Sequence, residues 1–331
     1  MFLKKTVLFC LVFCLLLCGC SPSPVAVTVG ERKVDMAAYA FYIHYNLMNL
    51  SVDYGYSPDT LYSDEMTEQI KADALDQAVT AEVVRLLCAE KGLSLSDEQL
   101  EKLAADKKDF IESMGGKHAY LAFLRESALA DRVYDASQEN SLYYDMLSEY
   151  YYAEATEYYN DENLRQFFSE NYITVKYIRL GILNDEGLPL SEIDAAGKLT
   201  LANSLLAQAG QPDADFDALV AQYNDDAVME ANPDGLVVSI AEARESAYLA
   251  PAFDLAEGEI GGVYSASDGY YIVKRTAVGA GYFEENQSLI LQDAIDQYFA
   301  QALEQKKAET PVSTTNAYKK INLDNYMDYV K

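Results

Sequence analysis

The sequence predicts an α+β protein, with long helices toward both ends of the chain and short strands mixed with helices between them. Apolar side chains recur at spacings of three and four residues over 64–90, and this helical pattern returns over 284–307. Between these helices, short runs rich in β-branched and aromatic residues are typical of strands, over 175–183, 236–240 and 270–275. The length of 331 residues allows two domains with their own cores.

The first twenty residues have the pattern of a secretory signal that ends in a lipid-attachment cysteine. Two lysines precede an apolar run over 7–17 that is too short to span a bilayer. The run ends in Leu17-Cys18-Gly19-Cys20, which resembles the bacterial lipobox and so implies a diacylglycerol on Cys20. An ordinary signal peptide with incidental cysteines is the alternative. We expect a lipoprotein signal peptide over 1–19, a tether over 20–24 and an extracytoplasmic protein anchored to the outer face of a bacterial cell membrane.

Composition excludes several classes of partner and cofactor. A net charge of −28 argues against nucleic acid and against direct adsorption to anionic lipid. Beyond Cys20 the chain has only Cys88, so we expect no internal disulfide. His44 and His118 are the only histidines and have no zinc-ligand spacing, and we find no nucleotide-binding or calcium-binding motif. The sequence therefore predicts no metal and no cofactor.

Residues 25–172 are expected to form a helical domain that opens with a strand over 25–29. Helices are predicted over 34–54 and 64–90, and a third begins at Ser96, whose side chain can form a capping box with Gln99. That helix ends at Gly115-Gly116. A further helical stretch reaches residue 159, with a break predicted near Ser137-Gln138, and Asn160 caps a last short helix.

The remaining elements alternate strands and helices before one long helix returns. A strand over 175–183 is followed by predicted helices over 190–210 and 215–223. Strands over 236–240 and 270–275 come next, and Gly279-Ala280-Gly281 separates them from the helix over 284–307. The tail from Thr310 is expected to be extended and to add a strand or arm to the helical domain.

Residues 253–275 resemble the closing segment of parvulin-type (PpiC-type) peptidyl-prolyl isomerase domains. The matching positions of the family pattern F-x-L-x-x-G-E-I…G-Y-H-I-I-K are Phe253, Leu255, Gly258, Glu259, Ile260, Val263, Gly269, Tyr270, Ile272 and Lys274. The family histidine is replaced by Tyr271. The resemblance implies an isomerase-like domain over 173–278 with the element order βαααβαββ.

The N-terminal part resembles PrsA-type foldase lipoproteins and SurA-type chaperones. The shared features are a strand that runs into Gly30-Glu31, a long helix, the linker Lys-Gly-Leu-Ser-Leu-Ser-Asp-Glu-Gln-Leu at 91–100 and the break at Gly115-Gly116. This resemblance implies a discontinuous helical chaperone domain, in which residues 282–331 pack on residues 25–172. The parvulin-like domain is then an insertion.

The resemblance also implies where an isomerase site should lie. Parvulins hold the proline ring among Leu, Met and Phe, beside a polar cluster of two histidines and an Asp or Cys. The substrate-binding positions of this chain are Leu236, Arg244 in place of Met, Tyr248 in place of Phe, and Phe253. The polar positions are Asp226, the acidic member, with Arg179 and Tyr271 at the histidine positions.

Both replacements remove a group that titrates near neutral pH. Prolyl isomerisation crosses a barrier of about 18–20 kcal/mol and requires a site that favours the twisted amide. Arginine stays charged and tyrosine ionises near pH 10, so neither behaves as imidazole does. We expect Arg179, with Arg244, to form an ion pair with Asp226; the alternative is that both arginines point to solvent and the domain is a scaffold.

These observations predict a membrane-anchored protein-folding factor that binds unfolded or proline-containing secreted polypeptides. Its isomerase activity is expected to be weak or absent. Two alternatives remain open: an active peptidyl-prolyl cis-trans isomerase, and a lipoprotein scaffold for one fixed protein partner.

Overall fold

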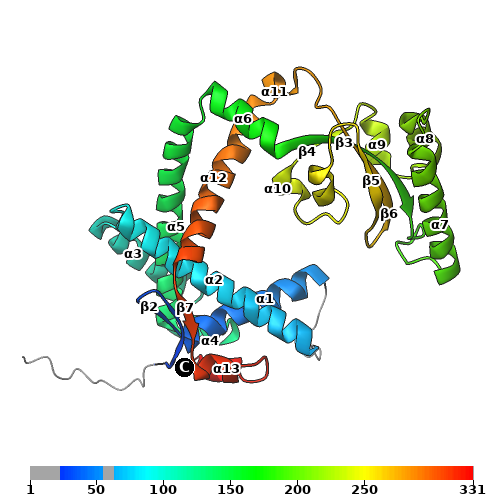
Figure 1. The fold of residues 1–331 in the computed structure, drawn as a ribbon. Helices are drawn as coiled ribbons and strands as arrows, with labels where there is room; N and C mark the ends of the chain where they lie inside the picture. The colour runs from blue at the N-terminus through cyan, green and yellow to red at the C-terminus, as the bar shows by residue number, and fades with distance from the viewer. Residues whose placement is uncertain (1–22, 55–62, 331) are drawn as a thin grey trace, which may run out of the picture. The chain divides into compact units, whose positions relative to one another are not determined.

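The computed structural model describes residues 23–54 and 63–330, and the side chains of 51–54 are not described. The predicted signal peptide over 1–19 and Cys20 lie outside the described residues. The chain divides into two compact units: residues 1–149 with 302–331, which we call unit 1, and residues 150–301, which we call unit 2. The divisions fall inside two helices, α5 (Asp131–Tyr158) and α12 (Gln287–Glu309), whereas the sequence-predicted boundaries enclose the shorter segment 173–278. Described residues from the early and the late part of the chain, β1 (Val25–Val29) and β7 (Val312–Thr314) in Figure 1, thus belong to one unit, as expected for a discontinuous domain.

Unit 1 contains a small antiparallel sheet that joins the two ends of the chain. Its strands are β1 (Val25–Val29), β2 (Arg32–Asp35) and β7 (Val312–Thr314), in the order β2-β1-β7. Val27 pairs with Thr314, which confirms that the tail adds a strand to the N-terminal body. The extended part is short, because the chain continues into α13 (Asn316–Lys320) and the 3-10 turn η2 (Tyr326–Tyr329).

Five helices form the rest of the described part of unit 1, together with the end of α12. They are α1 (Met36–Tyr54), α2 (Asp64–Glu90), α3 (Asp97–Ser113), α4 (Lys117–Glu126) and α5 (Asp131–Tyr158). The capping box of Ser96 and Gln99 is present at the start of α3, as predicted. The predicted break near Ser137-Gln138 is wrong: α5 continues through it, because the Ser137 hydroxyl donates to the carbonyl of Tyr134 within the helix. The chain turns earlier, at Ala128, whose φ is 48°.

Unit 2 contains a four-stranded antiparallel sheet of order β4-β3-β6-β5 (Figure 1). The strands are β3 (Tyr172–Gly181), β4 (Leu236–Ser239), β5 (Ile260–Ser265) and β6 (Gly269–Thr276). The helices between them are α7 (Glu192–Ala209), α8 (Phe216–Tyr223), α9 (Ala227–Ala231), α10 (Ile240–Ala243) and the 3-10 turn η1 (Ala250–Asp254). With η1 set aside, this order is βαααβαββ, so the predicted α+β class and the order of the inserted domain are confirmed.

Helices that precede and follow this sheet in the chain complete unit 2. They are the end of α5, α6 (Asp161–Asn171), α11 (Tyr282–Glu285) and most of α12 (Gln287–Glu309). Asn160 caps α6 through its side chain, as predicted. Tyr172, the first residue of β3, is buried against Phe167 and Phe283, and its hydroxyl donates to Asp293 on α12 at 2.8 Å. These contacts hold the first residue of β3 against α6, α11 and α12.

Alternation along β3 separates two cores, one on each face of the sheet. Ile178 and Leu180 lie in the core that includes Leu205 of α7 and Phe216 of α8. Val175 and Tyr177, with the opposite side-chain direction, pack in the other core with Met229 of α9. Arg179 shares the parity of Tyr177 and so points to this second face, where Leu236, Tyr248, Phe253 and Tyr271 also pack. Among the described residues, no helix is both long and apolar enough to cross a membrane.

Candidate functional site

The β3–β6 register brings the two positions of the missing histidines together. Arg179 of β3 lies directly opposite Tyr271 of β6 in the antiparallel ladder. Directly opposed residues of a sheet project their side chains to the same face and lie in contact distance. The fold therefore places these two residues side by side on one face of the sheet.

Three of the predicted substrate-binding residues pack around Tyr271. Leu236, Tyr248 and Phe253 are partly buried against the cluster that contains Tyr271 and Tyr177. They come from β4, from the segment after α10 and from η1. Arg244, the fourth, does not join them: it ends α10 with an exposed side chain and forms no ion pair with the described residues.

A stack of two tyrosines forms the centre of this face. The rings of Tyr248 and Tyr271 are parallel within 7°, with centroids 3.7 Å apart. Tyr177 meets both rings more steeply, at centroid distances of 5.3 Å and 5.5 Å. Tyr177 and Tyr271 are almost fully buried, whereas Tyr248 is half-buried. An aromatic surface with one partly open ring can hold an apolar side chain or a proline ring by contact area.

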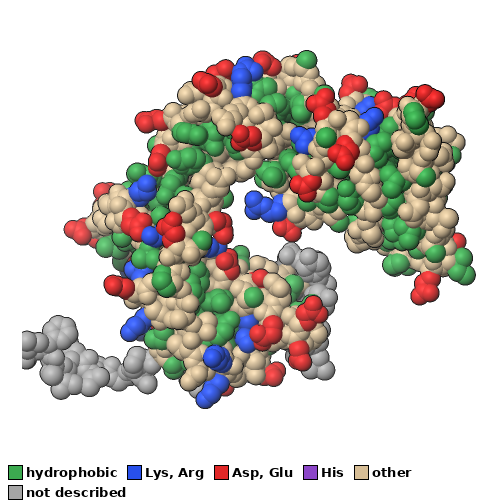
Figure 2. Space-filling view, viewed as in Figure 1, with side chains coloured by type: hydrophobic (Ala, Val, Ile, Leu, Met, Phe, Trp, Pro, Cys, Tyr) green, Lys and Arg blue, Asp and Glu red, His purple; other side chains and the backbone are tan. Residues whose placement is uncertain are grey.

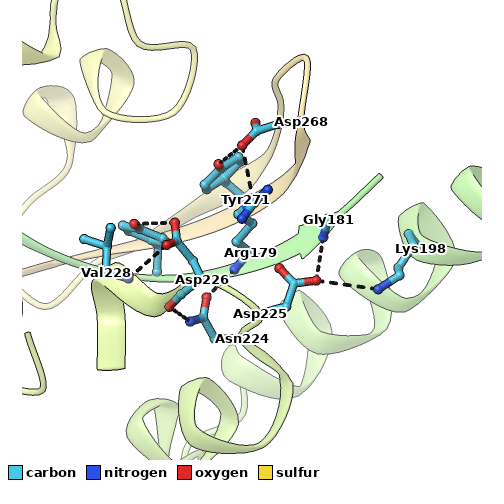
Figure 3. A network of polar contacts seen from close by, with 10 residues as sticks. Arg179, Gly181, Lys198, Asn224, Asp225, Asp226, Val228, Asp268 and Tyr271 are labelled. Atoms are coloured by element: carbon cyan, nitrogen blue, oxygen red, sulfur yellow. Dashed lines mark hydrogen bonds and ion pairs between the residues drawn. The ribbon is translucent and has the colours of Figure 1, made fainter. Parts of the chain in front are cut away.

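Arg179 and Tyr271 share one carboxylate, that of Asp268 (Figure 3). The Tyr271 hydroxyl donates to Asp268 Oδ2 at 2.9 Å, and Arg179 Nε lies 3.2 Å from the same oxygen. The arginine contact is ionic, because Nε makes no well-directed hydrogen bond within the described structure. Burial raises the pKa of Tyr271, and its hydrogen bond to Asp268 raises it further. Tyr271 therefore remains a protonated donor at neutral pH.

Asp226, the predicted acidic member, is engaged by other groups. Its Oδ2 accepts from the Tyr177 hydroxyl at 2.8 Å, and its Oδ1 accepts from the backbone N–H of Val228 at 2.9 Å, which caps α9. The predicted pairing of Arg179 with Asp226 is wrong in its partner, because Arg179 pairs with Asp268. The physical reason is local: Asp268 lies in the turn before Tyr271, while both oxygens of Asp226 already accept hydrogen bonds.

The segment Asn224-Asp225 fixes Asp226 by covering an open edge of β3. β4 pairs only with residues 172–175 of β3, so the backbone beyond them needs other partners. The Arg179 N–H donates to Asn224 Oδ1 at 2.9 Å, and the Arg179 carbonyl accepts from the Asp225 N–H at 3.1 Å. The Gly181 N–H donates to Asp225 Oδ2 at 2.8 Å (Figure 3). Side chains thus replace a neighbouring strand and place Asp226 beside Tyr177.

Sequence reasoning missed four residues of this network. Tyr177 carried a usable signal, because period-two alternation puts it on the same face as Val175 and Arg179. The other three lie in turns, where no periodicity reports which way a side chain points: Asn224, Asp225 and Asp268.

No group with metal-binding geometry accompanies the tyrosines. The described residues contain no cluster of three or more His, Cys, Asp or Glu side chains that could hold an ion. Cys88 is buried, its Sγ lies 3.4 Å from the carbonyl oxygen of Tyr143, and burial raises the pKa of its thiol. The candidate site is thus built from aromatic rings, carboxylates and one guanidinium.

Comparison with known proteins gives one family match and several distant structures. Residues 3–148 match the SurA-like N-terminal domain. Peptidylprolyl isomerase PrsA from Bacillus anthracis is 15% identical over 72% of this chain and 97% of that chain, with a TM-score of 0.37. PrsA from Bacillus subtilis is 16% identical over 80% of this chain and 84% of that chain, with a TM-score of 0.24.

A third structure comes from work on two SurA-like chaperones, PEB4 and Cj1289, of Campylobacter jejuni. It is 10% identical over 88% of this chain and 99% of that chain, with a TM-score of 0.30. The search of curated proteins finds no match. Residues 3–148 thus match the SurA-like N-terminal domain, and the solved structures to which the chain is similar include PrsA proteins and a SurA-like chaperone.

Proposed function

We propose that the protein is an extracytoplasmic folding factor that holds unfolded polypeptide and has little or no prolyl isomerase activity. The SurA-like N-terminal domain supports the chaperone part of this proposal. In unit 2, the proposed client-binding surface of the protein is the aromatic face of Tyr177, Tyr248 and Tyr271. Leu236 and Phe253 lie at the border of this face. Proline-containing segments are the natural ligands, because an aromatic face grips the rigid proline ring with little loss of entropy.

The observation that carries the proposal is that the polar groups of the site already bind one another. Arg179 and Tyr271 both reach Asp268, while Tyr177 and Val228 engage both oxygens of Asp226. Isomerisation requires groups that interact more strongly with the twisted amide than with the planar one. Groups that already bind each other must break those contacts first, so they bring little advantage to the transition state. Binding of the apolar parts of a client needs no such exchange.

We also propose attachment to the membrane through a lipid on Cys20. The support is the sequence Leu17-Cys18-Gly19-Cys20 at the end of an apolar run. Two or more acyl chains would hold the protein stably, where a single chain holds only marginally. Mass spectrometry of the mature protein tests this directly, and Cys20→Ser should release it from the membrane fraction.

The central test measures holding and isomerisation with the same protein. One assay follows aggregation of a chemically unfolded client, and the other follows refolding of a client whose slow step is an X–Pro isomerisation. We expect suppression of aggregation and an unchanged refolding rate. Acceleration that Asp226→Ala abolishes would overturn the proposal in favour of an active isomerase. Absence of any effect on aggregation would overturn the chaperone part.

Variants at the aromatic face locate the activity. Tyr248→Ala removes the half-buried ring of the stack and should weaken suppression of aggregation. Ser265→Ala, on the exposed end of β5, is the matched control for a change in the same sheet. Circular dichroism of each variant separates loss of binding from loss of fold.

A further inference from the structure

A groove on unit 2 lies between α8, α9 and β3, beside the aromatic face. Its volume is about 410 Å³, within the range of about 300–1,000 Å³ that is usual for ligand pockets. Its polar lining includes Lys176, Asp217, Asn224 and Glu230. The groove meets the Arg179 network at Asn224, which lines the groove and accepts from the Arg179 N–H.

The apolar side chains of the lining, which we call the floor, are those of Val220, Ala221, Met229 and Pro233, and of these Met229 is buried. Met229 is 4% exposed, and its sulfur lies 3.4 Å from the backbone nitrogen of Tyr177, so the aromatic face and the groove share this side chain as a common wall. A floor held by a buried residue is preformed, which keeps the ordering cost of binding small.

The rim of the groove carries negative charge. Asp217 and Glu230 line it with exposed side chains, and Asp234 follows the lining residue Pro233. The sequence from 210 to 243 contains Asp and Glu residues but no Lys or Arg. Lys176 is the cation at the groove, and its ammonium lies 2.9 Å from Asp217, so the pair adds no net charge. Glu230 forms no ion pair with the residues that the structure describes, so its carboxylate gives the rim a negative charge.

We infer that this groove is a second polypeptide subsite, which takes a basic and apolar stretch of an extended client. This inference rests on the proposed function, since it names a class of client segment. Aliphatic side chains would cover Val220 and Met229, and a lysine or arginine side chain would lie along the floor with its charge at Glu230. Long basic side chains suit such a site, because their methylene groups pack on apolar surface while the charged end stays at the rim.

With this subsite, unit 2 would also bind client segments that contain no proline. A segment bound at the groove lies on one side of Met229 and the aromatic face on the other. A client could then occupy either surface or both, and occupation of two linked sites raises the overall affinity without new contacts at either. Proline is required only at the aromatic face.

The test uses labelled peptides without proline, so that binding at the groove is read separately. One ten-residue peptide alternates lysine with leucine and valine, and its partner replaces each lysine by glutamate. Fluorescence anisotropy with the full chain should give saturable binding of the lysine peptide that weakens with added salt. The glutamate peptide should bind at least about tenfold more weakly, because its charge repels the rim.

Variants with matched controls decide whether the groove is the site. Ala221→Trp fills the groove from α8 and should abolish binding, whereas Ala218→Trp, exposed on the same helix outside the groove, should bind as the wild type does. Glu230→Gln should weaken the lysine peptide about threefold, in line with one exposed ion pair. Glu186→Gln, an exposed acid outside the groove, should have no effect.

Each outcome bears on a single proposal. Binding of the lysine peptide that Ala221→Trp leaves intact, or that Ala218→Trp reduces equally, would overturn the subsite. Equal binding of the two peptides would overturn its charge preference. Suppression of aggregation that survives in Ala221→Trp would leave the proposed function standing. Peptide binding at the groove without suppression of aggregation would instead remove the proposed function and leave the subsite.

Discussion

Arg179 and Tyr271 lie opposite each other on neighbouring strands, and their side chains converge on a single oxygen, Asp268 Oδ2. A cation and a hydroxyl donor around one carboxylate form a stable local arrangement, because opposite charges attract and a charged acceptor strengthens the hydrogen bond from Tyr271. Imidazoles at these positions would leave groups that titrate near neutral pH. In this chain the same positions instead hold groups that keep their protonation state across the physiological range.

Replacing the shared acceptor should destabilise unit 2. Asp268→Asn removes the negative charge that pairs with Arg179 and weakens the hydrogen bond from Tyr271. We expect a loss of about 1–2 kcal/mol in the free energy of unfolding, with the ion-pair part kept small because Asp268 is partly exposed. Urea denaturation measures it. Asp254→Asn, an exposed acid in η1, is the control, and equal stability of the two variants would contradict the assigned role of Asp268.

The stack and the hydroxyl of Tyr271 should contribute differently to client binding. Tyr271→Phe keeps the ring on Tyr248 and loses only the hydrogen bond to Asp268, so binding of a proline-containing peptide should change less than twofold. Tyr248→Ala removes one ring of the stack and should weaken that binding about tenfold, as expected for a loss of about 1–1.5 kcal/mol of aromatic contact. Isothermal titration with both variants makes the comparison. A larger loss in Tyr271→Phe would show that the polar network, and not the aromatic surface, binds the client.

The fold was largely predictable because its elements carry strong local signals. Helix α2 begins and ends where the sequence pattern predicts, since Ser63 caps one end and Gly92 follows the other. The capping box of Ser96 and the cap by Asn160 are local chemistry and need no tertiary information. The break expected near Ser137-Gln138 is absent from α5, where the Ser137 hydroxyl bonds back to the carbonyl of Tyr134.

The site was predictable in position but not in its polar contacts. Strand alternation and family register put Arg179 and Tyr271 on one face with Leu236, Tyr248 and Phe253. The carboxylate with which Arg179 pairs depends on the conformation of two loops, one that contains Asp268 and one that contains Asp226. Turn geometry is set by side-chain caps and by the open edge of β3, and neither is visible as a period in the sequence.

Removing the edge cover of β3 should cost stability in the same unit. Asn224→Ala leaves the Arg179 N–H without its acceptor at 2.9 Å and frees the Asp226 carbonyl, to which Asn224 Nδ2 donates at 2.7 Å. We expect a loss of about 2–3 kcal/mol in the free energy of unfolding, because two partly buried backbone groups lose partners. Asn203→Ala on the exposed face of α7 provides the control. Hydrogen exchange at Arg179 should become faster only in the first variant.

Alkaline pH should destabilise unit 2 through its buried tyrosines. Burial raises the pKa of Tyr177 and Tyr271, and their hydrogen bonds to Asp226 and Asp268 add to the effect. A raised folded-state pKa means that stability is complete below the unfolded value near 10 and falls as pH rises above it. Each tyrosine contributes a slope of up to about 1.4 kcal/mol per pH unit. Urea denaturation at pH 8, 10 and 11 should show that the free energy of unfolding declines less steeply for Tyr271→Phe than for the wild type. Tyr158→Phe, whose ring is half exposed, should follow the wild-type decline.

Acid should loosen the C-terminal tail of unit 1 through His44. This histidine lies on α1, and its Nδ1 is 3.0 Å from the hydroxyl of Tyr326 in η2. Burial lowers the pKa of His44, so the unfolded chain takes up the proton first. Stability is then complete above pH 6.5, the unfolded value, and decreases as pH falls through the window below it.

The His44 variant separates this contribution from the many carboxylates of the chain. Between pH 7 and pH 5, the wild type should lose more stability than His44→Gln, by up to about 1.4 kcal/mol per pH unit within the window. His118→Gln, which changes an exposed histidine of the same unit, should follow the wild-type curve. Hydrogen exchange of residues 322–330 at pH 5 should rise in the wild type if protonation of His44 breaks the contact with Tyr326. Parallel pH curves for the wild type and His44→Gln would show that the tail is held by its other contacts, among them the ring contact of Tyr39 with Tyr318 at 5.2 Å.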